Sequence, residues 1–476
     1  MRLLNFILFL LFLNTAIGQS KRVVFRSTDT SVQHAFHAAS EMALSYRGSP
    51  TDPVGPWYEA ALPSRNAFCM RDVSHQCIGA EILSMSAENK NMFTHFVRNI
   101  SNGKDWCTYW EINIEGKPAP EDYRNDTAFW YNLNANFDLV YASWRLYLWT
   151  GDSSYIFDPA FSFFRDISAS EYINRWVLQA DSLLTRRPYP NAPIPFNTRD
   201  YFHRCRGLPS YTENVGDLRM GADLVAALYQ GLQTCASIEQ LKGNKKAAVQ
   251  YREQAEKYKL QLDKHWWDPG AGRYNTHITN AGKFGKGEGE TFLLWFDALT
   301  DTTRIRQTIG HLLGNEWNVE NLSYQPAIFY KYGYWDKAYA ILLHLADKAT
   351  PRREYPEVSY GVIDGIVQGL MGVAADARFN RIETLYRNQN GQSASLEHLP
   401  VLSTHVSIIH WAGKTKFKNE GPSTIKWRAA FSGNHKHIYA AGRKYTAKQQ
   451  VEKMGNIVSY IDLTVGPQQA VAAALK

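Results

Sequence analysis

The chain has 476 residues, a formal net charge of +7, 13% aromatic residues and five cysteines. A small, odd number of cysteines excludes a fold held by a disulfide framework, and without a Cys-x-x-Cys pair we expect no metal site. The positive charge comes without a recognisable nucleic-acid-reading motif, so we expect no nucleic-acid partner, whereas an anionic glycan would be attracted. We expect no cofactor, and His435–His437 is interpreted as a solvated basic turn.

The first residues have the layout of a cleaved secretory signal. Residues 1–18 carry one arginine, then an apolar run, and end on the small residues Ala16 and Gly18. The run is short for a membrane span, so the mature chain is expected to begin at Gln19. The protein is therefore expected to be exported to the periplasm or the medium, without a membrane span, and to be a monomer.

Residues 19–396 contain a recurring unit of an aromatic-rich helix, a turn and a second helix. In one copy an apolar stripe recurs every three or four residues, with Lys and Glu on the other side, which is typical of a packed helical hairpin. The copies do not recur at a regular spacing along the chain, so a closed ring of hairpins explains the pattern better than an open solenoid. The fold class is therefore predicted to be all-α. The copies are 74–100, 136–161, 221–267 and 324–347, and their turn glycines are Gly151, Gly243 and Gly333.

Residues 397–476 have a different pattern of short β-prone segments at 404–411, 423–431 and 436–442. We expect a small β-rich C-terminal region packed on the helical ring. The long loop 186–217, rich in Pro, Asn, Arg and Tyr, is the kind of segment that carries sites on a rigid scaffold.

Three clusters of acids precede predicted helices. An acid in that place is often only a helix cap or a first-turn residue, and Asp223 and Glu290 fit that interpretation best. Like charges on Glu213 and Asp217 would raise the pKa of the drier carboxyl, as a general acid requires. The clusters are Glu213, Asp217 and Asp223; Glu288 and Glu290; and Glu354, Glu357 and Asp364.

The third cluster carries the candidate base. Arg352 and Arg353 beside Glu354 would keep that carboxylate ionised. Such an acid and base, roughly 6.5–9.5 Å apart, can hydrolyse a glycosidic bond with inversion.

Candidate substrate-binding residues combine aromatic side chains with polar ones. The aromatic residues could stack on sugar rings, and the Arg71–Asp72 pair could clamp sugar hydroxyls or be a structural ion pair. The candidates are Trp57, Tyr58, Arg65, Arg71, Asp72, His75, Gln76, Trp106, Trp110, Tyr211 and Glu288.

The sequence resembles the six-hairpin (α/α)6 toroid glycoside hydrolases, which include trehalases, glucoamylases and α-L-rhamnosidases. The resemblance lies in "EYPEVSYGVIDGIV", "ENVGD", "SRNAFCMRDVSHQ" and "GADLVAALYQGL". It implies an (α/α)6 catalytic domain, Asp217 as proton donor and Glu354 as the base that activates water. Glu213 or Glu357 remain alternatives for this chemistry.

The combined interpretation is an exo-acting, inverting glycoside hydrolase that removes a terminal sugar from cell-wall or algal oligosaccharides, with uronic, sulfated or rhamnose residues as candidate sugars. One alternative is a polysaccharide lyase acting on a uronate-containing glycan, which would recruit Tyr211, His203 and Arg204. The other is a non-catalytic glycan-binding protein.

Overall fold

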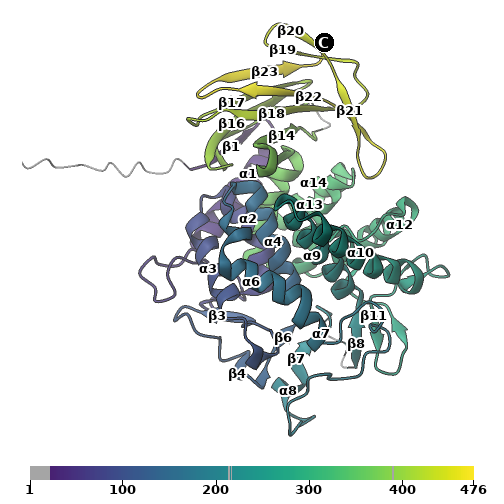
Figure 1. Ribbon diagram of the computed structural model, residues 1–476. Coiled ribbons are helices and arrows are strands. Elements are labelled where there is room, and N and C mark those ends of the chain that lie inside the picture. The colour runs from purple at the N-terminus through teal and green to yellow at the C-terminus, as the bar shows by residue number, and fades with distance from the viewer. Residues whose placement is uncertain (1–21, 213–214, 216, 389–390) are drawn as a thin grey trace, which may run out of the picture.

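A computed structural model describes residues 22–212, 215, 217–388 and 391–476. It has a helical body with a layer of strands on one side and a group of loops on the other (Figure 1). The expected secretory signal at 1–18 lies outside the described residues. Among the described helices, none has the length and apolar character needed to cross a membrane.

Six helices of the described chain follow one another around a closed ring, because each contacts the next and the last contacts the first. Six further helices lie outside this ring, and the last inner helix, α15, pairs with α1 from the start of the chain. The expected ring of helical hairpins is confirmed. The inner helices are α2 (Met70–Ile82), α4 (Ala135–Thr150), α9 (Ala222–Leu241), α11 (Glu290–Trp295), α13 (Val319–Lys331) and α15 (Pro356–Asp364). The outer helices are α1 (Thr30–Ser45), α3 (Ser86–Arg98), α6 (Pro159–Ile167), α10 (Lys245–Gln261), α12 (Thr302–Leu313) and α14 (Trp335–Ala346).

The hairpins form for the reasons that the sequence indicates. Gly151, Gly243 and Gly333 adopt the left-handed conformation, with φ of 78°, 81° and 81°, which ends each first helix at no steric cost. In the hairpin of α9 and α10, the whole predicted stripe faces the core. Its members, all buried, are Leu224, Leu228, Leu232, Cys235 and Ile238.

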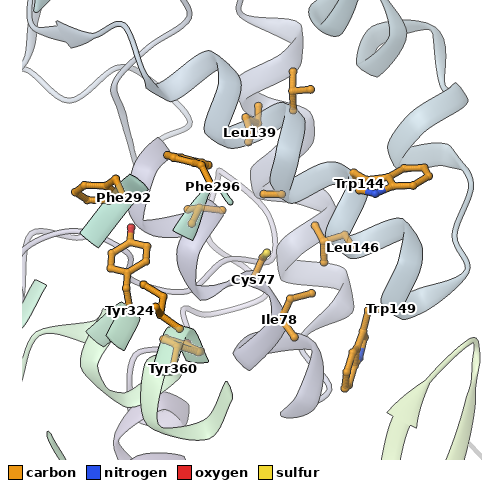
Figure 2. Packing of buried hydrophobic residues seen from close by; sticks show 14 of the residues in the cluster. Cys77, Ile78, Leu139, Trp144, Leu146, Trp149, Phe292, Phe296, Tyr324 and Tyr360 are labelled. Carbon is orange, nitrogen blue, oxygen red and sulfur yellow. The ribbon is translucent and has the colours of Figure 1, made fainter. Parts of the chain in front are cut away.

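The centre of the ring is filled with side chains. Figure 2 shows Cys77, Leu139, Phe292, Tyr324 and Tyr360, one from each of five inner helices, in the buried cluster. All of these side chains are buried. The ring therefore has a solid interior rather than a channel.

The loops at the end of the body away from the sheets contain short elements (Figure 1). Most are two- or three-residue strands that brace one loop against another. They are β2 (Ala67–Cys69), β3 (Glu111–Asn113), β4 (Tyr123–Asn125), β5 (Ala128–Phe129), β6 (Tyr131–Asn132), β7 (Arg206–Leu208), β8 (Leu218–Gly221), β9 (Trp267–Asp268), β10 (Arg273–Tyr274), β11 (His277–Thr279) and β12 (Phe284–Gly285), with helices α7 (Ile173–Arg175) and α8 (Tyr201–Cys205). Helix α5 (Ser154–Phe157) instead follows the end of α4 that contacts the sheets, where Ser403 Oγ donates to the Thr150 carbonyl.

The expected all-α class is wrong as a description of the whole chain, because the β region is sizeable. One sheet has the strand order β1-β15-β16-β17-β23-β19-β20 and the other β13-β14-β18-β22-β21. Phe417 of β17 stacks on Trp427 of β18 at 5.2 Å between ring centroids, which joins the two sheets face to face. The strands are β1 (Val24–Ser27), β13 (Val373–Asp376), β14 (Arg381–Leu385), β15 (Ala394–Val401), β16 (Thr404–Trp411), β17 (Lys414–Asn419), β18 (Ile425–Ser432), β19 (His437–Ala440), β20 (Arg443–Thr446), β21 (Lys448–Val451), β22 (Ile457–Val465) and β23 (Ala470–Ala474).

The strands also begin earlier than expected. A boundary between residues 396 and 397 would cut β15, and β13 begins at Val373. The N-terminal strand β1 belongs to the same layer, since Val24 pairs with Glu397 and Ser27 with Ala394. A four-residue edge strand whose partner lies so far along the chain leaves no local pattern from which it could be predicted.

Candidate active site

A cavity of about 710 Å³ is lined by residues of these loops and by the first turns of three inner helices. A neighbouring cavity of about 270 Å³ shares Arg71, Thr212, Glu320 and Arg352 with it. The inner helices α2, α13 and α15 begin at this place, with residues of their first turns in the cavity wall. The N-terminal ends of helices carry partial positive charge, which favours carboxylates and other anions there.

Three carboxyl groups meet in the larger cavity: Asp72 from α2, Glu320 from α13 and Glu357 from α15. The three helices are mutual neighbours, because α15 contacts both α2 and α13. Each acid stands in the first turn of its helix, so the side chains point toward the same opening.

The contact that brings these acids together lies one turn deeper. His75 Nε2 and Ser323 Oγ are hydrogen-bonded at 3.0 Å, which ties α2 to α13. Gly361 of α15 packs so close to Ser323 that a Cβ atom on Gly361 would lie 2.5 Å from the Ser323 carbonyl oxygen. Residues three or four positions apart share one face of a helix, so the acids three or four residues earlier must also converge.

The environment of Glu357 favours the neutral form of its carboxyl group. Only 5% of the residue is exposed, and its Oε2 atom has no hydrogen-bond partner in the described chain. Burial, and next the negative charge of Asp72, raise the pKa of Glu357 well above its usual value. Burial also raises the pKa of Asp72 to about 6, against the opposing effect of the adjacent Arg71. A protonated carboxyl group beside ionisable ones can donate a proton within the cavity.

A second acidic pair lies in the wall of the same cavity. Arg65 Nη2 lies 2.9 Å from Glu111 Oε2 and 3.1 Å from Asp122 Oδ2. Burial and the neighbouring Asp122 raise the pKa of Glu111 to about 9. The described residues include no group of three or more His, Cys, Asp or Glu side chains that could hold a metal ion.

The predicted acid and base do not reach either cavity. Asp217 is exposed, and Asn280 Nδ2 donates to its Oδ1 at 2.7 Å. Glu354 is also exposed, because it precedes the first turn of α15 and its side chain turns outward. Both stand at the rim, since the adjoining residues Leu218 and Tyr355 line the cavity. Glu213, the alternative acid, lies outside the described residues, whereas the alternative Glu357 lies inside the cavity.

Of the predicted binding residues, Arg65, Arg71, Asp72 and Trp110 line the larger cavity. Tyr211 and Glu288 line the smaller one, together with Arg71.

Five other predicted residues line neither cavity. Trp57 and Tyr58 are core residues whose polar atoms are satisfied by Asp52 and Asn89. The aromatic density of their segment therefore serves packing rather than sugar stacking. The other three are His75, which stacks on Tyr324, the buried Gln76, and Trp106, which packs against Phe163.

Sequence reasoning missed Glu320 and Trp130. Glu320 follows Asn318, whose side chain caps α13 by accepting from Asn321 N–H, so the same pattern of an acid in a first turn was present there. Trp130 lies against Trp110, with 4.3 Å between ring centroids, and both line the larger cavity. No residue pattern in the sequence distinguishes Trp130 from the many core aromatics.

No protein-family model matches the sequence, and no curated protein sequence matches it. Solved structures match its fold. The α-L-rhamnosidase from Dictyoglumus thermophilum aligns with a TM-score of 0.60 and 12% identity, over 96% of this chain and 51% of that chain. A rhamnosidase from Bacillus SP. GL1 aligns with a TM-score of 0.56 and 12% identity, over 83% of this chain and 40% of that chain. The rhamnosidase from Klebsiella oxytoca aligns with a TM-score of 0.50 and 11% identity, over 72% of this chain and 65% of that chain.

The chain spans about half of the length of the first of these rhamnosidases and less than half of the second. Identities this low establish a shared fold. The expected resemblance to six-hairpin (α/α)6 glycosidases is confirmed at that level.

Proposed function

We propose that this chain is an exo-acting, inverting glycoside hydrolase that releases a terminal sugar from cell-wall or algal oligosaccharides, including those with uronic, sulfated or rhamnose residues. The observation that carries the proposal is the convergence of the buried Glu357 carboxyl group with Asp72 and Glu320 in one cavity, where burial raises the pKa of Glu357. Glycoside hydrolysis requires such an asymmetric set, with one carboxyl protonated and another ionised.

In the proposed reaction Glu357 is the general acid and Glu320 the general base. Glu357 transfers its proton to the glycosidic oxygen as the bond from that oxygen to the anomeric carbon breaks. A water molecule on the opposite face of the sugar forms the new bond to the anomeric carbon and gives its proton to Glu320. Glu320 stands in the first turn of α13, where its carboxyl group faces the cavity from the N-terminal end of the helix.

Asp72 would have two roles. Its charge raises the pKa of Glu357, which keeps the acid protonated. Its position in the cavity wall beside Arg71 also allows it to accept hydrogen bonds from sugar hydroxyls.

The shape of the site supports action at chain ends. The packed core of the ring lies below the cavity. His75 and Tyr324 belong to this core and stack with 3.6 Å between their ring centroids. Because the ring has no channel, a bound chain cannot pass through it, and this supports a substrate that ends in the cavity. The paired Trp110 and Trp130 offer an aromatic surface for a sugar ring in its wall.

The geometry favours the hydrolase over a lyase. A lyase would need Tyr211 as a base, yet the Tyr211 hydroxyl donates a hydrogen bond to Asp138, and burial raises the pKa of Tyr211 well above 10. His203, the other candidate, does not line either cavity.

The test is incubation of the purified chain with oligosaccharide pools from plant cell walls and algae, with the fresh product followed by ¹H NMR. The expected result is one terminal sugar, released with inverted anomeric configuration by the wild type and not by Glu357→Gln. An unsaturated, ultraviolet-absorbing product would identify a lyase instead. Binding of oligosaccharides without turnover would identify a glycan-binding protein, and a retained anomer would refute inversion.

Export and assembly are proposed with the activity. We propose cleavage after Gly18, release into the periplasm or medium, and a monomer. N-terminal sequencing of the exported protein and light scattering on a sizing column test these two points.

A further inference from the structure

Three of the arginines that line the larger cavity form no ion pair with its acids. Five arginines line its wall, and two of them pair with carboxylates, Arg65 with Asp122 and Arg71 with Asp72. The other three, Arg186, Arg204 and Arg352, have no carboxylate within ion-pair distance among the described residues. Arg204 and Arg352 are exposed, so water can solvate their charges.

Arg186 differs because it is buried. Only 4% of the residue is exposed. Its Nε donates to the Trp176 carbonyl at 2.8 Å and its Nη1 to the Arg219 carbonyl at 3.3 Å, whereas Nη2 has no partner in the described chain. Burial lowers the pKa of Arg186 to about 10, which reflects the cost of holding this charge away from water.

A second guanidinium group lies in the adjoining segment. Arg219 donates to the carbonyl of Leu184 at 2.6 Å and also to the carbonyl of Asn280. It too has no carboxylate within ion-pair distance among the described residues, and Asn280 and Leu218 beside it line the cavity. Backbone carbonyls thus hold both side chains in place while leaving their charge uncompensated.

A buried charge without a counter-charge destabilises a fold by several kcal/mol, so such an arrangement indicates a ligand that supplies the missing charge. Guanidinium groups bind planar or tetrahedral oxyanions through paired N–H donors. We infer that Arg186 binds an anionic substituent, a carboxylate or a sulfate, on the oligosaccharide in this cavity. The inference rests on the proposed function for the assignment of the cavity to oligosaccharides. Arg204 and Arg352 raise the local concentration of anionic chains.

The experiment measures binding, with turnover disabled by Glu357→Gln in the full chain. The probes are oligosaccharides from oligogalacturonan, from glucuronoxylan and from a sulfated glucuronorhamnan. Each is used untreated, after chemical reduction of its carboxyl groups to alcohols, and after removal of its sulfates. Binding is measured by calorimetry at low salt. At least one untreated probe is expected to bind at least tenfold more tightly than its reduced or desulfated form, and the form that loses affinity identifies the anion.

Variants assign that preference to Arg186. Arg186→Gln is expected to remove the tenfold preference, and Arg186→Lys to keep part of it because the charge remains. Arg443→Gln, at an exposed arginine of β20, makes the same change in net charge far from the cavity and is expected to keep the preference. Melting curves show whether each variant is folded.

Equal affinity for charged and neutral forms of every probe would overturn the inference whatever the variants do, and so would a preference that survives in Arg186→Gln. Hydrolysis of neutral and charged pools at equal rates by the wild type would leave the proposed function intact and refute this inference. Arg186-dependent binding of anionic probes without hydrolysis by the wild type would support this inference and refute the proposed function.

Discussion

Gly361 of α15 lies against the Ser323 carbonyl of α13 so closely that a methyl group on Gly361 would be 2.5 Å from that oxygen. Glu357 precedes Gly361 by four residues and Glu320 precedes Ser323 by three, so this contact lies one helical turn below the acids. The distance between the proposed acid and base is therefore set by a glycine contact one helical turn below their carboxyl groups.

Substitution of Gly361 by alanine is expected to destabilise the protein by about 1–3 kcal/mol, because the two backbones must separate. It should also lower the rate of hydrolysis, because the acids move apart. Urea unfolding and kcat measure the two effects. Gly310→Ala in α12 is the control, since a Cβ there meets nothing within 4 Å and alanine should stabilise the helix by about 0.5–1 kcal/mol. A Gly361→Ala protein as stable and active as the wild type would contradict the packing argument.

Loss of either proposed catalytic group should reduce activity strongly. Glu357→Gln and Glu320→Gln are each expected to lower kcat/KM by about 10²–10⁴-fold, the usual contribution of a general acid or base. Asp217→Asn and Glu354→Gln change exposed carboxylates at the cavity rim and are expected to stay within about tenfold of the wild type. Steady-state kinetics on one released sugar compares all four. A larger loss of activity in Asp217→Asn and Glu354→Gln than in the other two variants would identify Asp217 and Glu354 as the catalytic acid and base.

The pH profile should report the coupling between Asp72 and Glu357. The general acid must be protonated, so kcat/KM falls as the pH rises through the pKa of Glu357. The negative charge of Asp72 raises that pKa, and Asp72→Asn removes the charge, so the alkaline limb of the profile should move to lower pH. Asp217→Asn serves as the matched variant and should leave the limb in place. A limb that stays fixed in Asp72→Asn would mean that Glu357 is not the titrating acid.

Glu111 should make stability fall with rising pH. The folded chain holds the Glu111 proton up to a pKa of about 9, whereas the unfolded chain loses it above its usual value near 4.5. The folded state binds more protons in that window, so the free energy of unfolding decreases as the pH rises, by at most about 1.4 kcal/mol per pH unit. Glu111→Gln should flatten this dependence. Melting temperatures from pH 5 to 9 test it, with the exposed Glu115→Gln as reference; parallel curves would exclude the effect.

Local patterns predicted local structure well. The 404–411 segment forms β16 over the same residues, and the hairpin at 221–267 contains α9 and α10 with the expected stripe buried. Periodicity and turn glycines are properties of neighbouring residues, so they can be read from the sequence. The pairing of β1 with β15 depends on residues far apart in the chain and left no such pattern.

The site was only partly predictable for the same reason. The sequence indicated that acids at helix starts matter, and Glu357 and Asp72 were among the candidates. It could not distinguish Glu354, which precedes the helix and faces solvent, from Glu357, which is three residues further along the chain and buried. Which acids share a cavity is decided by contacts such as His75 with Ser323, between helices far apart in the chain.

The pairing of β1 with β15 has a consequence for synthesis. During translation Val24 emerges early, but its partner Glu397 leaves the ribosome only after the whole helical ring has been made. Strand β1 must remain unpaired until then, whereas helix α1, which follows β1 directly, can pack against α15 once residues 356–364 have been made. A nascent chain stalled before residue 394 would thus display β1 as an unpaired strand, which can pair with other chains.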